Sequence, residues 1–275
     1  MPRQSQCLKV KGYNGTVKSD QKKSIVYNEK KPTGMLASFV QAFWHFENKG
    51  NEIRQYSILP DGCFDLILYF EDQAWSKSVL TGLWNQNVDV SLSEKADLWA
   101  IRFKPLAAEY ILGKSLVALL NSTTTISNNE GIGALLCTEY QDFDTFVASN
   151  SAALETHLTD GQPIDPRKKI VFDLLFESQG DISIKTLSER ATWSNRQISR
   201  YFKKNLGITA KEYANILRVH AAYKDLAKGI QHPQTAYYDQ SHFIKEVKKY
   251  TGEQPKTLAE NKNDRFLQLS TKDRD

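Results

Sequence analysis

Two patterns of hydrophobic and polar positions divide the chain. Up to about residue 105, aromatic and branched residues form short runs with strand character, at 43–46, 63–70 and 98–103. Beyond them, apolar residues recur every three or four positions, which is the spacing of amphipathic helices. The pattern predicts an α+β protein of two domains. A β-rich, sandwich-like or barrel-like amino-terminal domain with trailing helices is followed by an all-α helix-turn-helix domain.

The domain boundaries are predicted from composition. We expect a flexible, lysine-rich tail over 1–31, the β-rich domain over 32–160, the helical domain over 161–265 and a second tail over 266–275. Gly161, Gln162 and Pro163 are the expected linker. Asp165 and Pro166 then begin a helix whose buried face is predicted to contain Ile170, Val171, Leu174 and Leu175.

One helix pattern occurs twice in the carboxy-terminal domain. Each copy starts with a capping residue and places apolar residues four and eight positions later: Ser194, Ile198 and Phe202, then Asp239, Phe243 and Val247. Before the first copy, a short helix capped by Ser183 and a tight turn complete the arrangement of a helix-turn-helix. Between the copies, Thr209 to Lys228 contains no glycine or proline and predicts a linking helix of about 18 residues.

The region from about 166 to 262 resembles the DNA-binding domain of AraC-type bacterial transcription regulators. The residues that carry the resemblance are Leu187, Ser194, Arg196, Ile198, Arg200, Phe202, Lys203, Lys204, Gly207, Tyr237, Tyr238, Asp239, Gln240, Ser241, His242, Phe243, Lys248, Gly252 and Pro255. More loosely, 36–178 resembles the uncharacterised amino-terminal domain often fused to such regulators. The resemblance implies a sequence-specific transcription regulator that reads the major groove mainly through the helix 194–205 and secondarily through the helix 239–250.

The DNA-contacting residues follow from helix geometry and from the resemblance. Positions one, two, five and six after the cap share the face opposite Ile198 and Phe202, which makes Asn195, Arg196, Ser199 and Arg200 the base-facing candidates. Gln240, Ser241, His242 and Lys245 occupy the matching places, and Lys203, Lys204, Lys248 and Lys249 suit phosphate contacts. A phosphate contact or an intradomain ion pair is the alternative for Arg200. A core position is the alternative for His242.

The second copy departs from the family pattern. The segment 229–235 is too short for the usual positioning helix, and Pro233 breaks it. We therefore expect the second helix to contact DNA more weakly than the first.

The charge distribution agrees with a nucleic-acid partner. From Asp165 onward, 21 lysine and arginine residues stand against 14 acidic ones, a balance of +7, whereas the preceding part has a balance of −3. Three cysteines without metal-binding spacing predict a reducing compartment. No apolar run has the length of a membrane span, so a soluble, cytoplasmic protein without a membrane partner is expected.

The candidate ligand site lies in the amino-terminal domain. Trp44, His45, Asp65 and Arg102 combine aromatic and polar groups on strand-like segments. Three of the four have a structural alternative. Trp44 fills the core, Asp65 satisfies backbone groups at a turn, and His45 lacks the second histidine and the glutamate that a metal site requires. The spacing of these residues identifies no ligand, and we predict neither a metal nor a cofactor.

Three classes of function remain in view. The first is a transcription regulator that binds double-stranded DNA. The further partners considered for it are a small-molecule effector, a second copy of the chain in a homodimer and, for an activator, RNA polymerase. The second is an interaction or dimerisation protein with weakened DNA binding. The third, a small-molecule-binding β-barrel enzyme, lacks sequence support, because no His-X-His, nucleophile elbow or glycine-rich phosphate loop occurs. We therefore predict no catalytic residues.

Overall fold

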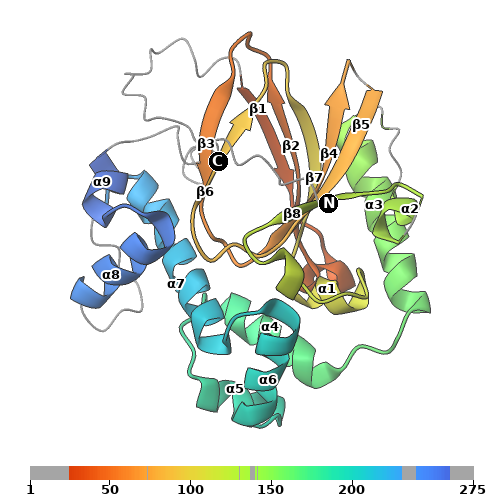
Figure 1. Cartoon of the computed structure of the whole chain (residues 1–275). Helices are drawn as coiled ribbons and strands as arrows, with labels where there is room; N and C mark the ends of the chain where they lie inside the picture. Colours follow the sequence, from red (N-terminus) through yellow and green to blue (C-terminus); the bar gives the residue numbers. More distant parts are fainter. Residues whose placement is uncertain are drawn as a thin grey trace, which may run out of the picture.

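A computed structural model describes residues 25–72, 74–129, 131–136, 140, 142–230 and 240–260 of the 275-residue chain. The strands lie together in the upper part of Figure 1, and the helices of the carboxy-terminal half lie below and beside them. None of the described helices is both long and apolar enough to cross a lipid bilayer.

An antiparallel sheet of six strands forms the centre of the amino-terminal domain. Its order is β1-β2-β7-β4-β5-β8, and β3 pairs separately with β6. The strands are β1 Ile25–Lys30, β2 Val40–Asn48, β3 Arg54–Ile58, β4 Phe64–Glu71, β5 Ala74–Thr81, β6 Val88–Leu92, β7 Asp97–Phe103 and β8 Thr123–Ile126. The strand β1 begins inside the segment 1–31 that was expected to be a tail, so the domain starts earlier than predicted.

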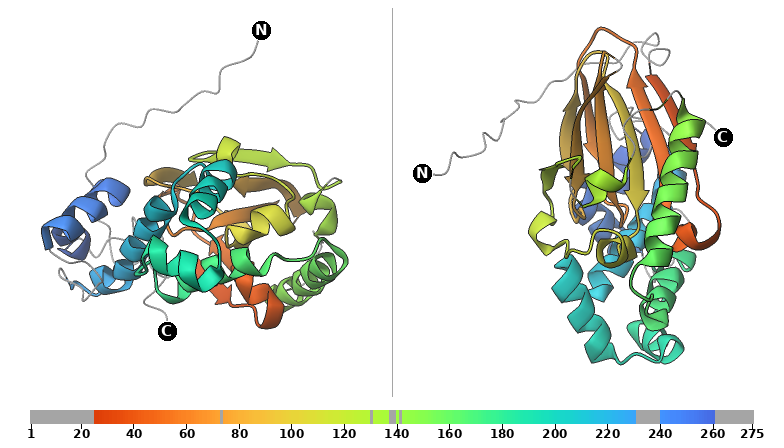
Figure 2. Two further views of the ribbon diagram at one scale, coloured as in Figure 1. Left: turned by 90° about the horizontal axis from the view of Figure 1, so that it is seen from below. Right: turned by 90° about the vertical axis from the view of Figure 1, so that its right-hand side faces the viewer.

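The two faces of the sheet are covered by different elements. The β3–β6 ribbon packs on one face, where the rings of Phe46 and Tyr56 meet edge to face. The helix α3 (Phe143–Asp160) lies along the other face (Figure 2, right), where Phe146 contacts Phe43 and Trp99. This is a sandwich-like arrangement, and the described strands form an open sheet. The barrel-like alternative for this domain is therefore wrong.

Among the remaining helices, those that begin at residues 166, 184, 195 and 210 start where the sequence predicts. The remaining helices are η2 Gly34–Ser38, α1 Leu106–Tyr110, η3 Val117–Leu119, α2 Ile132–Leu135, α4 Pro166–Glu177, α5 Ile184–Ala191, α6 Asn195–Leu206, α7 Ala210–Ala227, α8 Gln240–Thr251 and α9 Pro255–Glu260. Asp165 caps α4 by accepting a hydrogen bond from the backbone of Arg167. One residue of the predicted α4 face is wrong, because Ile170 is exposed and Phe172 is fully buried.

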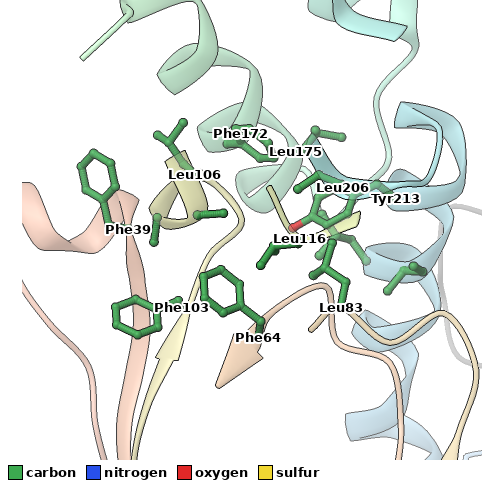
Figure 3. Close-up of a cluster of buried hydrophobic side chains, with 14 of the residues drawn as sticks. Phe39, Phe64, Leu83, Phe103, Leu106, Leu116, Phe172, Leu175, Leu206 and Tyr213 are labelled. Carbon is green, nitrogen blue, oxygen red and sulfur yellow. The ribbon is translucent and has the colours of Figure 1, made fainter. Parts of the chain in front are cut away.

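One hydrophobic core runs through both domains. Phe39, Leu106 and Leu116 of the amino-terminal domain belong to the same buried cluster as Phe172 and Tyr213 of the carboxy-terminal domain (Figure 3). All five side chains are at least nine-tenths buried. The helical domain is therefore packed onto the base of the β-rich domain, beyond the covalent connection through the linker.

Candidate nucleic-acid interface

The first helix-turn-helix consists of α5 and α6. Ser183 caps α5 through a hydrogen bond from the backbone of Thr186, and Thr192 makes the turn in a left-handed conformation. Ser194 and Gln197 then form a capping box: the Ser194 hydroxyl accepts from the Gln197 backbone at 3.3 Å, and the Gln197 carbonyl oxygen accepts from the Ser194 backbone at 3.1 Å. The predicted start of the first reading helix is confirmed.

The helix α6 separates a buried face from an exposed one. Ile198 and Phe202 are fully buried, whereas the four predicted base-facing residues are exposed: Asn195, Arg196, Ser199 and Arg200. Neither Arg196 nor Arg200 forms an ion pair with any described residue. The intradomain ion pair considered for Arg200 is therefore wrong within the described part of the chain, and both guanidinium groups point to solvent.

The helix α7 lies between α6 and α8 in the chain and has the predicted length of 18 residues. Thr209 and Glu212 form a second capping box at its start, with 2.7 Å between the Thr209 backbone nitrogen and a Glu212 carboxylate oxygen. At about 1.5 Å per residue, α7 is about 27 Å long. Figure 1 shows α6 near one end of α7 and α8 near the other.

The helix α8, the second copy of the repeated pattern, also has a buried face and an exposed face. Phe243 and Val247 are buried, and the predicted contact residues are exposed: Gln240, Ser241, His242, Lys245, Lys248 and Lys249. A core position for His242 is therefore wrong. The cap Asp239 and the shortened segment after Ile230 lie outside the described residues. Whether a positioning helix precedes α8 thus stays a prediction.

The lysine side chains at the ends of α6 and α8 have different surroundings. Lys203 lies 3.9 Å from a carboxylate oxygen of Glu212 and donates to the Gly207 carbonyl at 3.4 Å. Lys204 is exposed and forms no ion pair among the described residues. In α8, the Lys249 ammonium lies 4.7 Å from the centre of the Tyr250 ring. Lys204 is therefore the freer cation at the end of α6.

Three of the four ligand-site candidates meet in the amino-terminal domain. Trp44, Asp65 and Arg102 stand on the neighbouring strands β2, β4 and β7, and Asp65 is directly opposite Arg102 in the register. The Asp65 carboxylate accepts from the Trp44 indole at 2.8 Å and from Arg102 Nε at 3.1 Å. The turn role considered for Asp65 is therefore wrong. Trp44 is 5% exposed and also belongs to the core, as its alternative predicted.

Asp61 joins this cluster, which the sequence did not reveal. Its carboxylate lies 3.5 Å from Arg102 Nε and accepts a hydrogen bond from the backbone of Cys63. The Pro60-Asp61-Gly62 sequence indicated only a turn, and the arginine that the turn faces lies about forty residues away. Burial raises the pKa of Asp65, and Arg102 opposes this rise. Burial alone would lower the pKa of Arg102, but the carboxylates of Asp65 and Asp61 outweigh it and raise this pKa well above its usual value.

His45 does not belong to the same cluster. Successive residues of a strand point to opposite faces, so His45 lies on the side of α3 while Trp44 faces the ribbon. Its Nε2 lies 2.9 Å from the Asp97 carboxylate, and its ring lies 4.4 Å from that of Trp99. The structure thus separates His45 from the other three candidates. Among the described residues, no group of three His, Cys, Asp or Glu side chains is placed to hold a metal ion.

Comparisons with known proteins match both parts of the chain. Residues 28–125 match a domain of unknown function (DUF6597), and residues 187–261 match a helix-turn-helix domain. No curated protein matches the sequence. Among solved structures, the apo form of a ToxT variant from Vibrio cholerae strain SCE256 is 11% identical, with coverage of 86% of this chain and 97% of that chain and a TM-score of 0.40. ToxT from Vibrio cholerae O395 is 13% identical, with 90% and 99% covered and a TM-score of 0.38.

Proposed function

We propose that this AraC-type DNA-binding transcription regulator reads its operator mainly through α6 and secondarily through α8. The helix-turn-helix match over residues 187–261 supports a DNA-binding regulator in preference to an enzyme. The observation that carries the proposal is the exposed face of α6, on which Arg196 and Arg200 lie without ion-pair partners among the described residues. An arginine fork can donate two parallel hydrogen bonds to guanine in the major groove.

The exposed face of α8 supports its secondary role. Its residues at the matching positions are Gln240, Ser241, His242 and Lys245, and its lysines Lys248 and Lys249 are exposed at the end of the helix. The helix α7 is about 27 Å long, and its flanking turns add to this length. The sum approaches the distance of about 34 Å between successive major-groove faces on one side of the duplex. One chain would thus contact two neighbouring grooves on one side of the duplex.

Selection of an operator from a pool of randomised duplexes, followed by binding to all its single-base variants, tests this function. We expect Arg196→Ala or Arg200→Ala to lower discrimination at one part of the operator by about 1–3 kcal/mol for each lost arginine–guanine contact. Gln240→Ala and His242→Ala are the matched substitutions in α8. Each should change the discrimination between operator variants by less than about 1 kcal/mol.

Two outcomes would contradict the proposal. If the α8 substitutions erase sequence preference while the arginine substitutions do not, α8 is the dominant reader. If the full chain selects no sequence at all, the chain is an interaction or dimerisation protein that has lost specific DNA binding. Sedimentation of the full chain separately tests the homodimer, and transcription with purified RNA polymerase tests activation.

We also propose that the cluster around Arg102 binds a small effector with a carboxylate or phosphate group. The hydrogen bonds and ion pairs of Arg102 with described residues use Nε, which leaves the two terminal amino groups for a ligand. The Arg102 side chain is 16% exposed, and its guanidinium carbon lies 5.9 Å from the Trp44 ring. A guanidinium fork beside an aromatic wall suits a planar anion.

A thermal-shift screen with a panel of carboxylates and organic phosphates tests the effector proposal. A bound ligand should raise the melting temperature of the wild-type chain in a concentration-dependent way. Trp44→Phe, which keeps an aromatic ring but loses the indole donor to Asp65, should weaken the shift, whereas His45→Gln on the other face of the sheet should retain it. Equal loss in both variants, or no shift with any anion, would contradict this site.

A further inference from the structure

The end of the recognition helix α6 is held by the amino-terminal domain. The Leu116 backbone donates to the Asn205 carbonyl at 2.8 Å, and the Ser115 hydroxyl lies 3.1 Å from the Lys204 carbonyl and 3.2 Å from that of Asn205. Carbonyl groups at the end of a helix lack partners within the helix and carry partial negative charge. Two donors from a segment about ninety residues earlier in the chain therefore complete this end of α6.

Glu109 makes a second contact with the same helix. One carboxylate oxygen of Glu109, on α1, accepts from the Tyr201 hydroxyl of α6 at 2.8 Å. Its other oxygen lies 2.6 Å from the Lys168 ammonium on α4. Burial, reinforced by the neighbouring carboxylate, raises the pKa of Tyr201, so its hydroxyl keeps the proton that it donates. One side chain of the amino-terminal domain thus joins α4 to α6.

Both contacts leave the reading face of α6 uncovered. Tyr201 is 8% exposed and lies on the buried side, whereas Arg196 and Arg200 are exposed in the complete chain. The contact is therefore compatible with DNA in the groove. The helix α8 packs on α7 and α9, and Gly252 at its end lies near Asn87 of the amino-terminal domain, so α8 does not share the Glu109 contact.

We infer that Glu109, together with Ser115 and Leu116, positions α6 for sequence reading, so that the amino-terminal domain forms part of the first DNA-reading unit. The inference rests on the proposed reading role of α6. A hydrogen bond to a carboxylate is stronger than one between neutral groups, and a small change in the tilt of α6 moves both arginines relative to the base edges. Glu109 is accordingly a positioning residue that acts on DNA through α6.

Binding of the full chain to the selected operator and its single-base variants tests the inference. We expect Glu109→Ala to lower discrimination about two- to tenfold at the base pairs that Arg196→Ala also affects, and to leave the base pairs read by α8 unchanged. Glu109→Gln keeps an acceptor for Tyr201 and should lose less. Asp144→Asn is the matched control, because Asp144 pairs with Lys30 inside the amino-terminal domain, at 2.9 Å.

The outcomes separate this inference from the proposed function. Uniform loss of affinity at every base pair, or an unchanged profile in both Glu109 variants, overturns the positioning role. Should Glu109→Ala fail to fold, Ser115→Ala provides the same test from the carbonyl end of α6. A wild-type chain that selects no operator contradicts the DNA-reading function itself. A wild-type chain that selects one, with variants that read it equally well, contradicts only the role of Glu109.

Discussion

Neighbouring side chains in one helix can have different electrostatic surroundings. Lys203 and Lys204 stand side by side in the sequence, yet a carboxylate oxygen of Glu212 lies 3.9 Å from Lys203 only. A lysine that is already paired with a carboxylate in the protein displaces fewer counterions from the DNA when it binds a phosphate. The two lysines should therefore contribute unequally to DNA affinity.

Lys204→Ala should reduce the slope of log affinity against log salt concentration by about 0.9, which is the contribution of one phosphate contact. Lys203→Ala should flatten it less, because Glu212 partly neutralises Lys203 in the free protein. Fluorescence anisotropy with a duplex at several salt concentrations measures both slopes. Lys49→Ala, an exposed lysine beside Glu47 of the β-rich domain, is the control and should leave the slope unchanged. Equal slopes for all three variants would mean that these lysines do not touch phosphates.

The buried charges around Arg102 predict a pH-dependent loss of stability. Arg102→Leu leaves the Asp65 and Asp61 carboxylates without their cation and should cost about 3–5 kcal/mol of unfolding free energy near neutral pH. A carboxyl group whose pKa is raised in the folded state contributes stability below its unfolded pKa of about 3.9 and loses it as the pH rises through the folded value. Loss of Arg102 raises the pKa of Asp65 further, because Arg102 is its main opposing influence.

The penalty of Arg102→Leu should therefore shrink as the pH falls toward 4. Urea unfolding at neutral and acidic pH measures it. Lys30→Leu, which removes an exposed ion pair with Asp144, is the control and should change stability little at either pH. A penalty that is the same at both pH values would show that Asp65 does not change its charge in this range.

At the scale of elements, the loop before β4 meets the linking helix directly. The Tyr213 hydroxyl of α7 donates to the Gly62 carbonyl at 2.8 Å, and Asp61, the preceding residue, faces Arg102. Gly62 has a φ of +79°, and a Cβ atom added there would lie 2.7 Å from Leu217 of α7. The loop thus connects the Arg102 cluster with α7, the helix between α6 and α8.

Gly62→Ala should weaken the contact between this loop and α7. Gly34→Ala is the matched control, because Gly34 also has a positive φ, of +63°, but no atom lies within 4 Å of an added Cβ. Both variants carry the strain of a left-handed alanine, so the difference between their melting temperatures measures the clash with Leu217 and Tyr213 of α7. We expect Gly62→Ala to melt at the lower temperature. Equal melting temperatures would mean that α7 moves aside at no cost.

The strands β2, β4 and β7 and the capped helices α4 to α7 were predictable from the sequence, and the neighbours of these elements were not. Capping residues such as Ser194 and Thr209 act within three residues, so local sequence located the helix starts. Successive residues of a strand point to opposite faces of the sheet, so Trp44 and His45 lie on different sides of it. The predicted ligand site grouped these residues by their chemical type and did not apply this alternation. Asp61 and Glu109 act on residues about 40 and 90 positions away, and no local pattern records such contacts. The exposed faces of α6 and α8 followed from helical periodicity alone.

At the scale of the whole molecule, the shared core argues against independent domains. The sequence predicts two units joined by the linker 161–163, whereas Phe172 and Tyr213 pack in one cluster with Phe39, Leu106 and Leu116 (Figure 3). Separation of the domains would expose these side chains to water. Burial of apolar surface of this kind is the main source of folding stability. The stability of each domain should therefore depend on the other.

A fragment from residue 161 onward should melt at a lower temperature than the full chain. The full chain should unfold in one calorimetric transition, because removal of either domain uncovers the cluster that both complete. A fragment that ends at residue 160 is the reciprocal control and should also lose stability. Two transitions in the full chain that coincide with those of the fragments would show that the shared cluster contributes little.

The shared core also sets an order of events during synthesis. The ribosome releases the amino-terminal domain first, so Phe39, Leu106 and Leu116 emerge well before the helices α4 and α7 that cover them. The nascent chain must therefore keep an apolar surface in contact with water, or with a chaperone, until α7, which ends at Ala227, has also emerged. Protease digestion of ribosome-bound chains of increasing length should show protection of the β-rich domain rising only once α7 has left the exit tunnel.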